Sequence, residues 1–424
     1  MGDFLSGIIV GLDVGTSIIK TVIGELDTDN TIKIIGFAKR PSPEGMLRNG
    51  VVVNIDAAVS AIKDCIEAAE QMAGHEVTEV YTAVGGSLVE GQNSEGEVVV
   101  DESRQKRALE IRDDTVNRAR EAGEAVMIPL DRTILHSVPQ TYIVDNVPTK
   151  HPVGVMGMRL KVKIHIITAS KTICRNMQEC IERAHYVCDA IWAKTMALSL
   201  ATIHDDEMSL GSILIDLGAG TTDVMVVNNG APVYMTSIEA GGNAVTNDIA
   251  QVYGIPFADA EKVKLEKGTC FMQPDDPDDE VLLPPIGGLP PVQSSQSELC
   301  AIIQPRMIEL FRLAKRAVAQ HSGLKKLNGS IVLTGGGAMM PGVVQLAQQL
   351  WGTASVRIGE VSDFGGIDKS YRDSVYSTAV GLLLARRSDE IVFAQKFSRK
   401  KAAPRDDSAN KLFEAVGNVF KKFF

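Results

Sequence analysis

The chain of 424 residues lacks the features that mark membrane-spanning, secreted or metal-thiolate proteins. It contains no run of about 18 apolar residues, so no helix is expected to span a bilayer. The apolar start, Phe4 to Leu12, follows no basic stretch and is interrupted by Asp13, which predicts a strand and not a signal peptide. Its six cysteines form no C-x-x-C pair, which favours reduced, buried thiols in a cytosolic protein over a metal site.

The charge is distributed unevenly. The net charge is −10, yet residues 396–424 contain eight Lys or Arg and three Asp or Glu, so residues 1–395 carry −15. An acidic body argues against nucleic acid as the main partner. A basic tail on such a body indicates that the tail alone contacts an anionic surface. The length predicts two or three domains with substantial cores.

Two stretches share one pattern, a strand, a turn and a returning strand. Residues Gly211 to Val227 place Asp216 and two glycines between apolar runs, and Ile8 to Gly24 place Asp13 in the same way. Glycines in such a turn allow backbone N–H groups to approach an anion, and an aspartate at the strand end suits a hydrated Mg²⁺. One such turn alone is typical of an ordinary hairpin. The repetition predicts two similar halves, each with a phosphate-facing loop.

A third glycine cluster, Gly335 to Gly337, follows an apolar strand and lets a nucleoside lie against the backbone. The order Asp-x-Gly-Thr, Asp-x-Gly-x-Gly-Thr and Gly-Gly-Gly resembles that of the actin-like ATPase superfamily, and within it the chain resembles the FtsA family of bacterial cell-division proteins. The resemblance extends from Val10 to Phe424. It implies an α/β, actin-like fold of two halves with duplicated ribonuclease-H-like cores and an extra subdomain called 1C.

The resemblance also implies the domain organisation. Subdomain 1A is expected over 1–85 and 169–207, subdomain 1C with protein contacts over 86–168, and subdomains 2A and 2B, which bind nucleotide and the FtsZ tail, over 208–387. A linker over 388–408 and an amphipathic membrane-targeting helix over 409–424 follow.

The resemblance assigns an ATP site between the two halves, with Asp13 and Asp216 toward Mg²⁺. Lys20, seven residues after Asp13, is expected to point its ammonium at the β- and γ-phosphates. Glu261 and Lys264 are expected beside the ribose and adenine, although they also fit an exposed ion pair. The full set of expected nucleotide-binding residues is Asp13, Gly15, Thr16, Ser17, Lys20, Gly218, Gly220, Thr221, Thr222, Gly241, Gly242, Asn243, Glu261, Lys264, Gly335, Gly336, Gly337 and Met339.

Hydrolysis needs a group that orients the attacking water. In actin-like relatives a Gln or Glu stands at the start of the helix before the second phosphate loop. The matching stretch here, Ala193 to Ala197, has no carboxylate or amide. The sequence therefore predicts ATP binding with at most slow hydrolysis, so that nucleotide acts as a switch for filament assembly.

The end of the chain predicts an interfacial helix. Apolar residues recur at helical spacing over Asn410 to Phe424, with lysines beside them, and a charged linker separates this stretch from the rest. Such a helix lies in the headgroup plane of a membrane, although docking on the protein's own core is the alternative. The residues expected at the membrane are Leu412, Phe413, Val416, Val419, Phe420, Lys421, Lys422, Phe423 and Phe424.

The family resemblance implies the partners: the C-terminal tail of FtsZ, further copies of the chain in a filament, later division proteins of the membrane, and lipid at the cytoplasmic face of the division septum. Arg306 is expected to bind the acidic FtsZ tail, from the first turn of a helix that Pro305 opens. Two alternatives are a pilus-assembly adaptor and a sugar or acetate kinase of the same superfamily.

Overall fold

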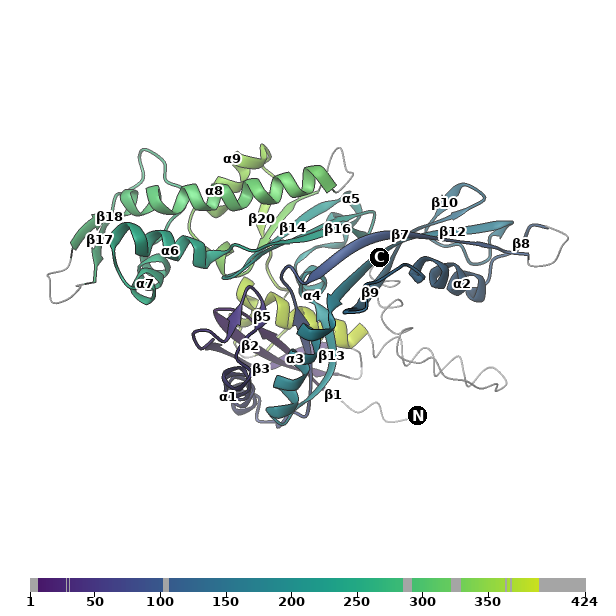
Figure 1. The fold of residues 1–424 in the computed structure, drawn as a ribbon, viewed down its shortest axis with the longest axis horizontal. Helices are drawn as coiled ribbons and strands as arrows, with labels where there is room; N and C mark the ends of the chain where they lie inside the picture. Colours follow the sequence, from purple (N-terminus) through teal and green to yellow (C-terminus); the bar gives the residue numbers. More distant parts are fainter. Residues whose placement is uncertain are drawn as a thin grey trace.

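The computed structural model describes residues 7–388, except for 28, 30, 102–106, 285–291, 322–328, 363 and 367. Two five-stranded sheets with the same strand order form the centre, and a four-stranded sheet lies beside them. Figure 1 shows an elongated molecule, with the four-stranded sheet at one end and helices of the second half at the other. Within the described residues, no helix is long and apolar enough to cross a membrane.

The first sheet combines an antiparallel meander with two parallel strands. In spatial order its strands are β13 (Val187–Ala193), β6 (Glu79–Val84), β1 (Gly7–Val14), β2 (Ile18–Leu26) and β3 (Ile32–Pro41). β1 is a nearly continuous apolar run because helices cover both faces of the sheet. Helices α1 (Ile55–Ala73) and α3 (Lys171–Arg183) share one core with β1, and a helix over 377–388 forms a second core on its other face.

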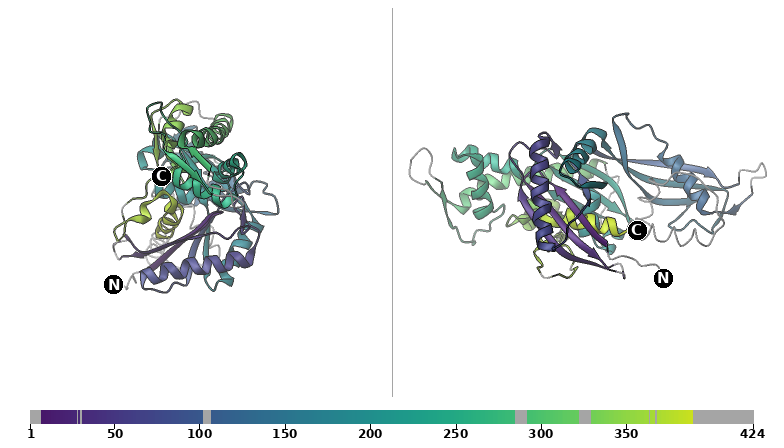
Figure 2. Two further views of the ribbon diagram at one scale, coloured as in Figure 1. Left: turned by 90° about the vertical axis from the view of Figure 1, so that its left-hand side faces the viewer. Right: turned by 90° about the horizontal axis from the view of Figure 1, so that it is seen from below.

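The second sheet repeats this arrangement. Its strands, in the equivalent spatial order, are β20 (Val356–Ile358), β19 (Ile331–Thr334), β14 (Ser212–Leu217), β15 (Thr222–Asn228) and β16 (Ala231–Ile238). Helices of this half are α6 (Gly242–Tyr253), α7 (Phe257–Lys267), α8 (Gln296–His321) and α9 (Val343–Trp351). The predicted duplicated two-half fold is confirmed, and Figure 2 shows the halves stacked on one another.

Short segments join and decorate the halves. Helices α4 (Lys194–Thr202) and α5 (Asp205–Leu210) lead from the first sheet into the second. Further short elements are the hairpins β4 (Leu47–Arg48) with β5 (Val51–Val52) and β17 (Glu280–Leu283) with β18 (Val292–Ser295), and the 3₁₀ turns η1 (Gly336–Met339), η2 (Ser370–Arg372) and η3 (Ser374–Tyr376).

The four-stranded sheet contacts both halves. It consists of β10 (Val147–Thr149), β9 (Arg132–Val144), β12 (Arg159–Ser170) and β7 (Val89–Val99), with helix α2 (Asp113–Glu124) on one face and the small pair β8 (Leu109–Glu110) and β11 (Met156–Gly157) nearby. Asn93 and Gln140 donate to the Val233 and Pro232 carbonyls of β16, each at 2.9 Å. His136 accepts the N–H of Ala193 at 2.9 Å. The four-stranded sheet therefore links the first half to the second.

One predicted boundary is wrong. Helix α8 begins at Gln296, nine residues before Pro305, so the proline lies inside the helix and does not open it. Proline removes one N–H and is disfavoured inside helices. Here Leu299 and Ile303, one turn apart, are fully buried in the core of the second half, and this packing extends the helix across the proline.

Candidate functional site

The two halves form a cleft between the equivalent ends of their sheets. All the predicted nucleotide-binding residues except Asn243 line it, together with Asp216. Asn243 lies just beyond, where its backbone N–H donates to the Ala219 carbonyl at 2.9 Å. The structure therefore brings the three glycine turns and both aspartates into one site.

The first hairpin carries a buried ion pair. Asp13 on β1 stands directly opposite Lys20 on β2, and their carboxylate oxygen and ammonium are 2.6 Å apart. Burial alone would raise the pKa of Asp13, but the ammonium groups of Lys20 and Lys194 outweigh it and lower this pKa. Asp13 is thus held as a carboxylate under the cleft floor.

The second hairpin has an acidic residue where the first has a lysine. Asp216 on β14 stands opposite Asp223 on β15, at the same seven-residue offset that separates Asp13 from Lys20. Both aspartates are at most 3% exposed. Burial, more than any other effect, raises the pKa of Asp223. This hairpin therefore needs a cation from elsewhere in the chain.

Lys194 supplies that cation. It is the first residue of α4, and its Nζ lies 2.6 Å from Asp216 Oδ2. Burial by itself would lower the pKa of Lys194, but the carboxylates of Asp216, Asp13 and Asp223 together raise it above the ordinary value. The cleft floor thus holds two ammonium groups, one on the first hairpin and one on the helix that joins the halves.

Glycines keep the walls of the floor close together. A Cβ at Gly335, whose φ is +83°, would lie 2.2 Å from Asp216 Oδ1, so only glycine fits this turn against the aspartate. A Cβ at Gly220 would lie 3.0 Å from the hydroxyl of Thr16. The two hairpin tips therefore face each other closely enough for one anion to contact both.

The other end of the cleft holds a third ion pair. Lys264 on α7 lies 2.6 Å from Glu261 and also donates to the Gly242 carbonyl and the Thr246 hydroxyl at 3.1 and 2.8 Å. Burial lowers the pKa of Lys264, although Glu261 opposes this. The pair is partly buried and ties α7 to α6, so it is not the exposed ion pair of the alternative interpretation. Met339 is half exposed at the rim.

The carboxylates expected to hold Mg²⁺ are both engaged by lysines. The ammonium of Lys20 lies 2.6 Å from a carboxylate oxygen of Asp13. The ammonium of Lys194 lies at the same distance from a carboxylate oxygen of Asp216. The described residues contain no cluster of three or more His, Cys, Asp or Glu side chains suited to a metal ion. A hydrated Mg²⁺ at either aspartate would have to compete with an ammonium group.

The comparisons with known proteins identify the family. Residues 213–381 match the model "Cell division protein FtsA", and residues 86–168 match the "SHS2 domain inserted in FTSA". The chain is 37% identical to the FtsA of Borreliella burgdorferi, over 98% of both chains. It is 33% identical to that of Escherichia coli, over 89% of both. The chain belongs to the FtsA family. Its members are cell-division proteins, and this confirms the predicted family and a role in cell division.

Solved structures support the actin-like fold of this FtsA-family chain. The PilM component of a "PilM-PilN type IV pilus biogenesis complex" aligns with a TM-score of 0.62 and 19% identity, covering 89% of this chain and 98% of that one. MreB5 of Spiroplasma citri aligns with a TM-score of 0.52 and 14% identity, covering 94% and 99%. At these identities the likeness concerns the fold.

Sequence reasoning on this FtsA-family chain missed Lys194 and Asp223. Lys194 stands in the stretch whose lack of a water-orienting carboxylate or amide predicts slow hydrolysis. The signal was available in the duplication: aligning Asp13 with Asp216 places Lys20 on Asp223, which leaves the second hairpin with two acids and no base.

Arg306 does not lie on the first turn of α8. It is in the helix interior, where it makes a bidentate contact with Asp248 of α6 at 2.7 and 2.9 Å and a further one with Glu309. The free helix N–H groups expected beside it are absent from this point of the helix. The predicted place of Arg306 on the first turn is therefore wrong, and its contact with an FtsZ tail, which would compete with Asp248 and Glu309, stays a prediction.

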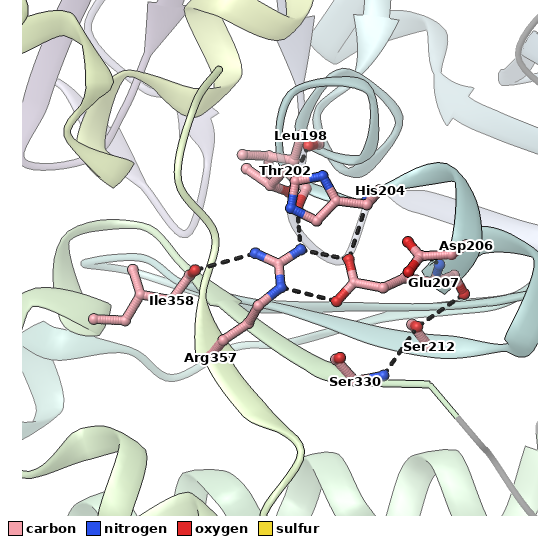
Figure 3. A network of polar contacts seen from close by, with 9 residues as sticks. All are labelled: Leu198, Thr202, His204, Asp206, Glu207, Ser212, Ser330, Arg357 and Ile358. Carbon is pink, nitrogen blue, oxygen red and sulfur yellow. Dashed lines mark hydrogen bonds and ion pairs between the residues drawn. The ribbon is translucent and has the colours of Figure 1, made fainter. Parts of the chain in front are cut away.

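A polar network holds the far end of α4, the helix that carries Lys194 (Figure 3). Arg357 on β20 donates to the Thr202 carbonyl at 2.7 Å and to both carboxylate oxygens of Glu207 on α5. The Glu207 carboxylate also accepts the N–H of His204 at 3.0 Å. These contacts fix the connection between the halves to the second sheet.

The predicted linker, except for Ser388, and the predicted membrane helix lie outside the described residues.

Proposed function

We propose that this chain binds ATP in the cleft between its halves. The observation that carries the proposal is the convergence of two duplicated Asp–Gly hairpins and one Gly-Gly-Gly turn on a single cleft whose floor holds two lysine ammonium groups. Backbone N–H groups at glycine turns and ammonium groups suit a polyphosphate. The fold neighbour MreB5 is described as bound to ADP and to AMPPNP, which supports a nucleotide in the equivalent cleft.

In this proposal Lys20 and Lys194 contact the phosphates, the Gly335 to Gly337 turn lies against the adenosine, and Lys264 with Glu261 flanks the ribose. When bound, Mg²⁺ would neutralise phosphate charge. The stretch at the start of α4 has no carboxylate or amide to orient a water, so we expect slow hydrolysis and a switch-like use of nucleotide.

We further propose that the chain is a division scaffold that tethers FtsZ to the cytoplasmic face of the membrane and polymerises when ATP is bound. Family membership supports a cell-division role. The apolar stripe of Leu412 to Phe424 and its lysines support membrane contact. Filaments presenting many such weak anchors would bind a membrane far more tightly than one copy does.

The test of the nucleotide proposal is a titration of the purified full-length protein with ATP, followed by an assay for phosphate transfer to sugars and acetate. We expect saturable ATP binding and no phosphorylated acceptor. Absence of ATP binding would overturn the proposal, and transfer to a small acceptor would favour the kinase alternative.

A further inference from the structure

Lys194 brings a fixed positive charge into the proposed ATP site, beside the carboxylate where a metal ion was expected. Its side chain is 19% exposed and lines the cleft with the two hairpin tips. Gly85 provides the space, since a Cβ there would lie 3.3 Å from both Cβ and Cδ of Lys194. The lysine is therefore packed into the floor and is not a surface side chain that happens to fold inward.

One oxygen of Asp216 is paired within the protein, and the other lies beside a glycine turn. Oδ2 accepts a hydrogen bond from the ammonium of Lys194 at 2.6 Å, and Oδ1 lies where a Cβ at Gly335 would be 2.2 Å away. A hydrated cation at Asp216 must therefore compete with Lys194 for the carboxylate. An ammonium has three donors, so Lys194 can hold Asp216 and still donate to a phosphate oxygen in the cleft.

The floor offers two cations for such a contact, although its carboxylates outnumber them. The buried acids Asp13, Asp216 and Asp223 face two ammonium groups, those of Lys20 and Lys194. Lys20 belongs to the first half, and Lys194 begins the helix that leads into the second. A polyphosphate seated between the hairpin tips thus meets both lysines, and each ammonium attracts phosphate oxygens as a metal ion would while it stays paired with its carboxylate.

We propose that Lys194 is a phosphate-binding residue that takes over much of the contribution of Mg²⁺, so that this chain binds nucleoside triphosphate with only a weak dependence on divalent metal. The proposal rests on the ATP site proposed above and adds the residue that determines its metal dependence.

The test compares ATP affinity in excess Mg²⁺ and in EDTA, by calorimetric titration of the full-length protein. For the wild type we expect affinities within about tenfold of each other, ~1.4 kcal/mol. Lys194→Gln keeps a donor to Asp216 but removes the charge. In EDTA it should bind ATP at least about tenfold more weakly than the wild type, and Mg²⁺ should restore most of this loss because the metal can then reach Asp216.

Lys63→Gln is the matched control, because Lys63 is a half-exposed lysine of α1, paired with Glu67 and outside the cleft. It should behave as the wild type does. If Lys194→Gln fails to fold, as judged by its melting curve, Lys194→Gln combined with Asp223→Asn, which also removes one buried carboxylate, provides the comparison. A wild type that binds ATP in Mg²⁺ but loses more than a hundredfold in EDTA, with the same ratio in the Lys194 variant, overturns the role of Lys194 and leaves the ATP site standing. No ATP binding under either condition overturns both proposals.

Discussion

Two ammonium groups and three buried carboxylates determine the chemistry of the cleft floor. In the first hairpin, the carboxylate of Asp13 is paired with the ammonium of Lys20. The second hairpin has Asp216 opposite Asp223, so its cation, Lys194, comes from another element. An unpaired buried carboxylate is costly, so the duplicated hairpin is stable in this form only with a cation supplied by α4. The ion pair therefore links the fold of the second half to the helix that joins the halves.

At the same scale, the turn after β19 gives a steric and electrostatic prediction. A Cβ at Gly336 meets no atom within 4 Å, so a side chain fits there and points into open space. Gly336→Asp should weaken ATP binding by at least about tenfold, ~1.4 kcal/mol, because it adds a negative charge beside the nucleotide. The matched Gly336→Ala should weaken binding less, because it adds a methyl group and no charge. Wild-type affinity of both variants in a binding titration would remove this turn from the site.

Among the elements, α4 connects the two halves, and side-chain contacts hold both of its ends. Lys194 binds the second hairpin at one end, and Arg357 binds the Thr202 carbonyl at the other. Glu207, 9% exposed in its side chain, completes this second anchor. Removing one partner from a buried ion pair leaves an uncompensated charge. Arg357→Ala should therefore cost about 3 kcal/mol of unfolding free energy.

The Glu207 anchor also predicts a pH dependence. Burial would raise the pKa of Glu207, but Arg357 and the His204 N–H more than offset this and lower it to about 2. A carboxylate with a depressed folded-state pKa stabilises the fold fully above its unfolded value, 4.5, and loses this contribution as the pH falls toward 2. The melting temperature of the wild type should therefore fall over this range more than that of Arg357→Ala. Parallel curves for the two proteins would contradict the assignment.

Arg306 of α8 is paired with Asp248 of α6, so a substitution of Arg306 affects the packing of these helices as well as any partner binding. Arg306→Glu would place a third acid beside Asp248 and Glu309, so it should loosen the two helices as well as weaken binding of an FtsZ tail peptide. Arg306→Met with Asp248→Asn removes the charges of the bidentate pair together and serves as the control. Fluorescence anisotropy at near-physiological salt measures peptide affinity. Wild-type affinity in both variants would exclude Arg306 from that interface.

The strands, the duplication and most helices could be predicted because apolar periodicity and glycine turns are local signals. Helix α8 was predicted to start too late because the local effect of Pro305 is opposed by the burial of Leu299 and Ile303, which only the tertiary structure reveals. The duplication shows that the second hairpin lacks a base, but it does not say which lysine supplies it, because Lys194 lies 22 residues before Asp216 on another element. The pairing of Arg306 with Asp248 could not be predicted either, because the two residues lie on different helices and no periodic pattern in the sequence relates them.

At the scale of the whole molecule, the inserted four-stranded sheet forms hydrogen bonds with both halves. Its β9 meets Ala193, the residue before Lys194, and its Asn93 and Gln140 hold the edge of the second sheet. The insertion therefore contacts both walls that a nucleotide would bring together. We expect filament assembly, the proposed consequence of nucleotide binding, to change the exposure of this sheet.

The tail gives the prediction at this scale. An interface buries the apolar stripe of residues 410–424 only partly, so one anchor should be weak and reversible, in the way a single acyl chain is. Phe420→Glu should release the protein from membranes nearly as completely as deletion of the stretch, because a charge on the apolar stripe opposes insertion. Neither change should alter ATP affinity. Lipid binding by Phe420→Glu at the wild-type level would place the anchor elsewhere.

The most direct test of the coupled scheme is sedimentation with anionic liposomes, with and without ATP, of the full-length protein and of a form ending at Ser408. ATP-driven assembly joins many weak anchors, so the full-length protein should sediment with liposomes more completely when ATP is present. The shortened form should remain in the supernatant under both conditions. Sedimentation that is indifferent to ATP, or that persists without residues 409–424, would contradict an ATP-gated membrane tether.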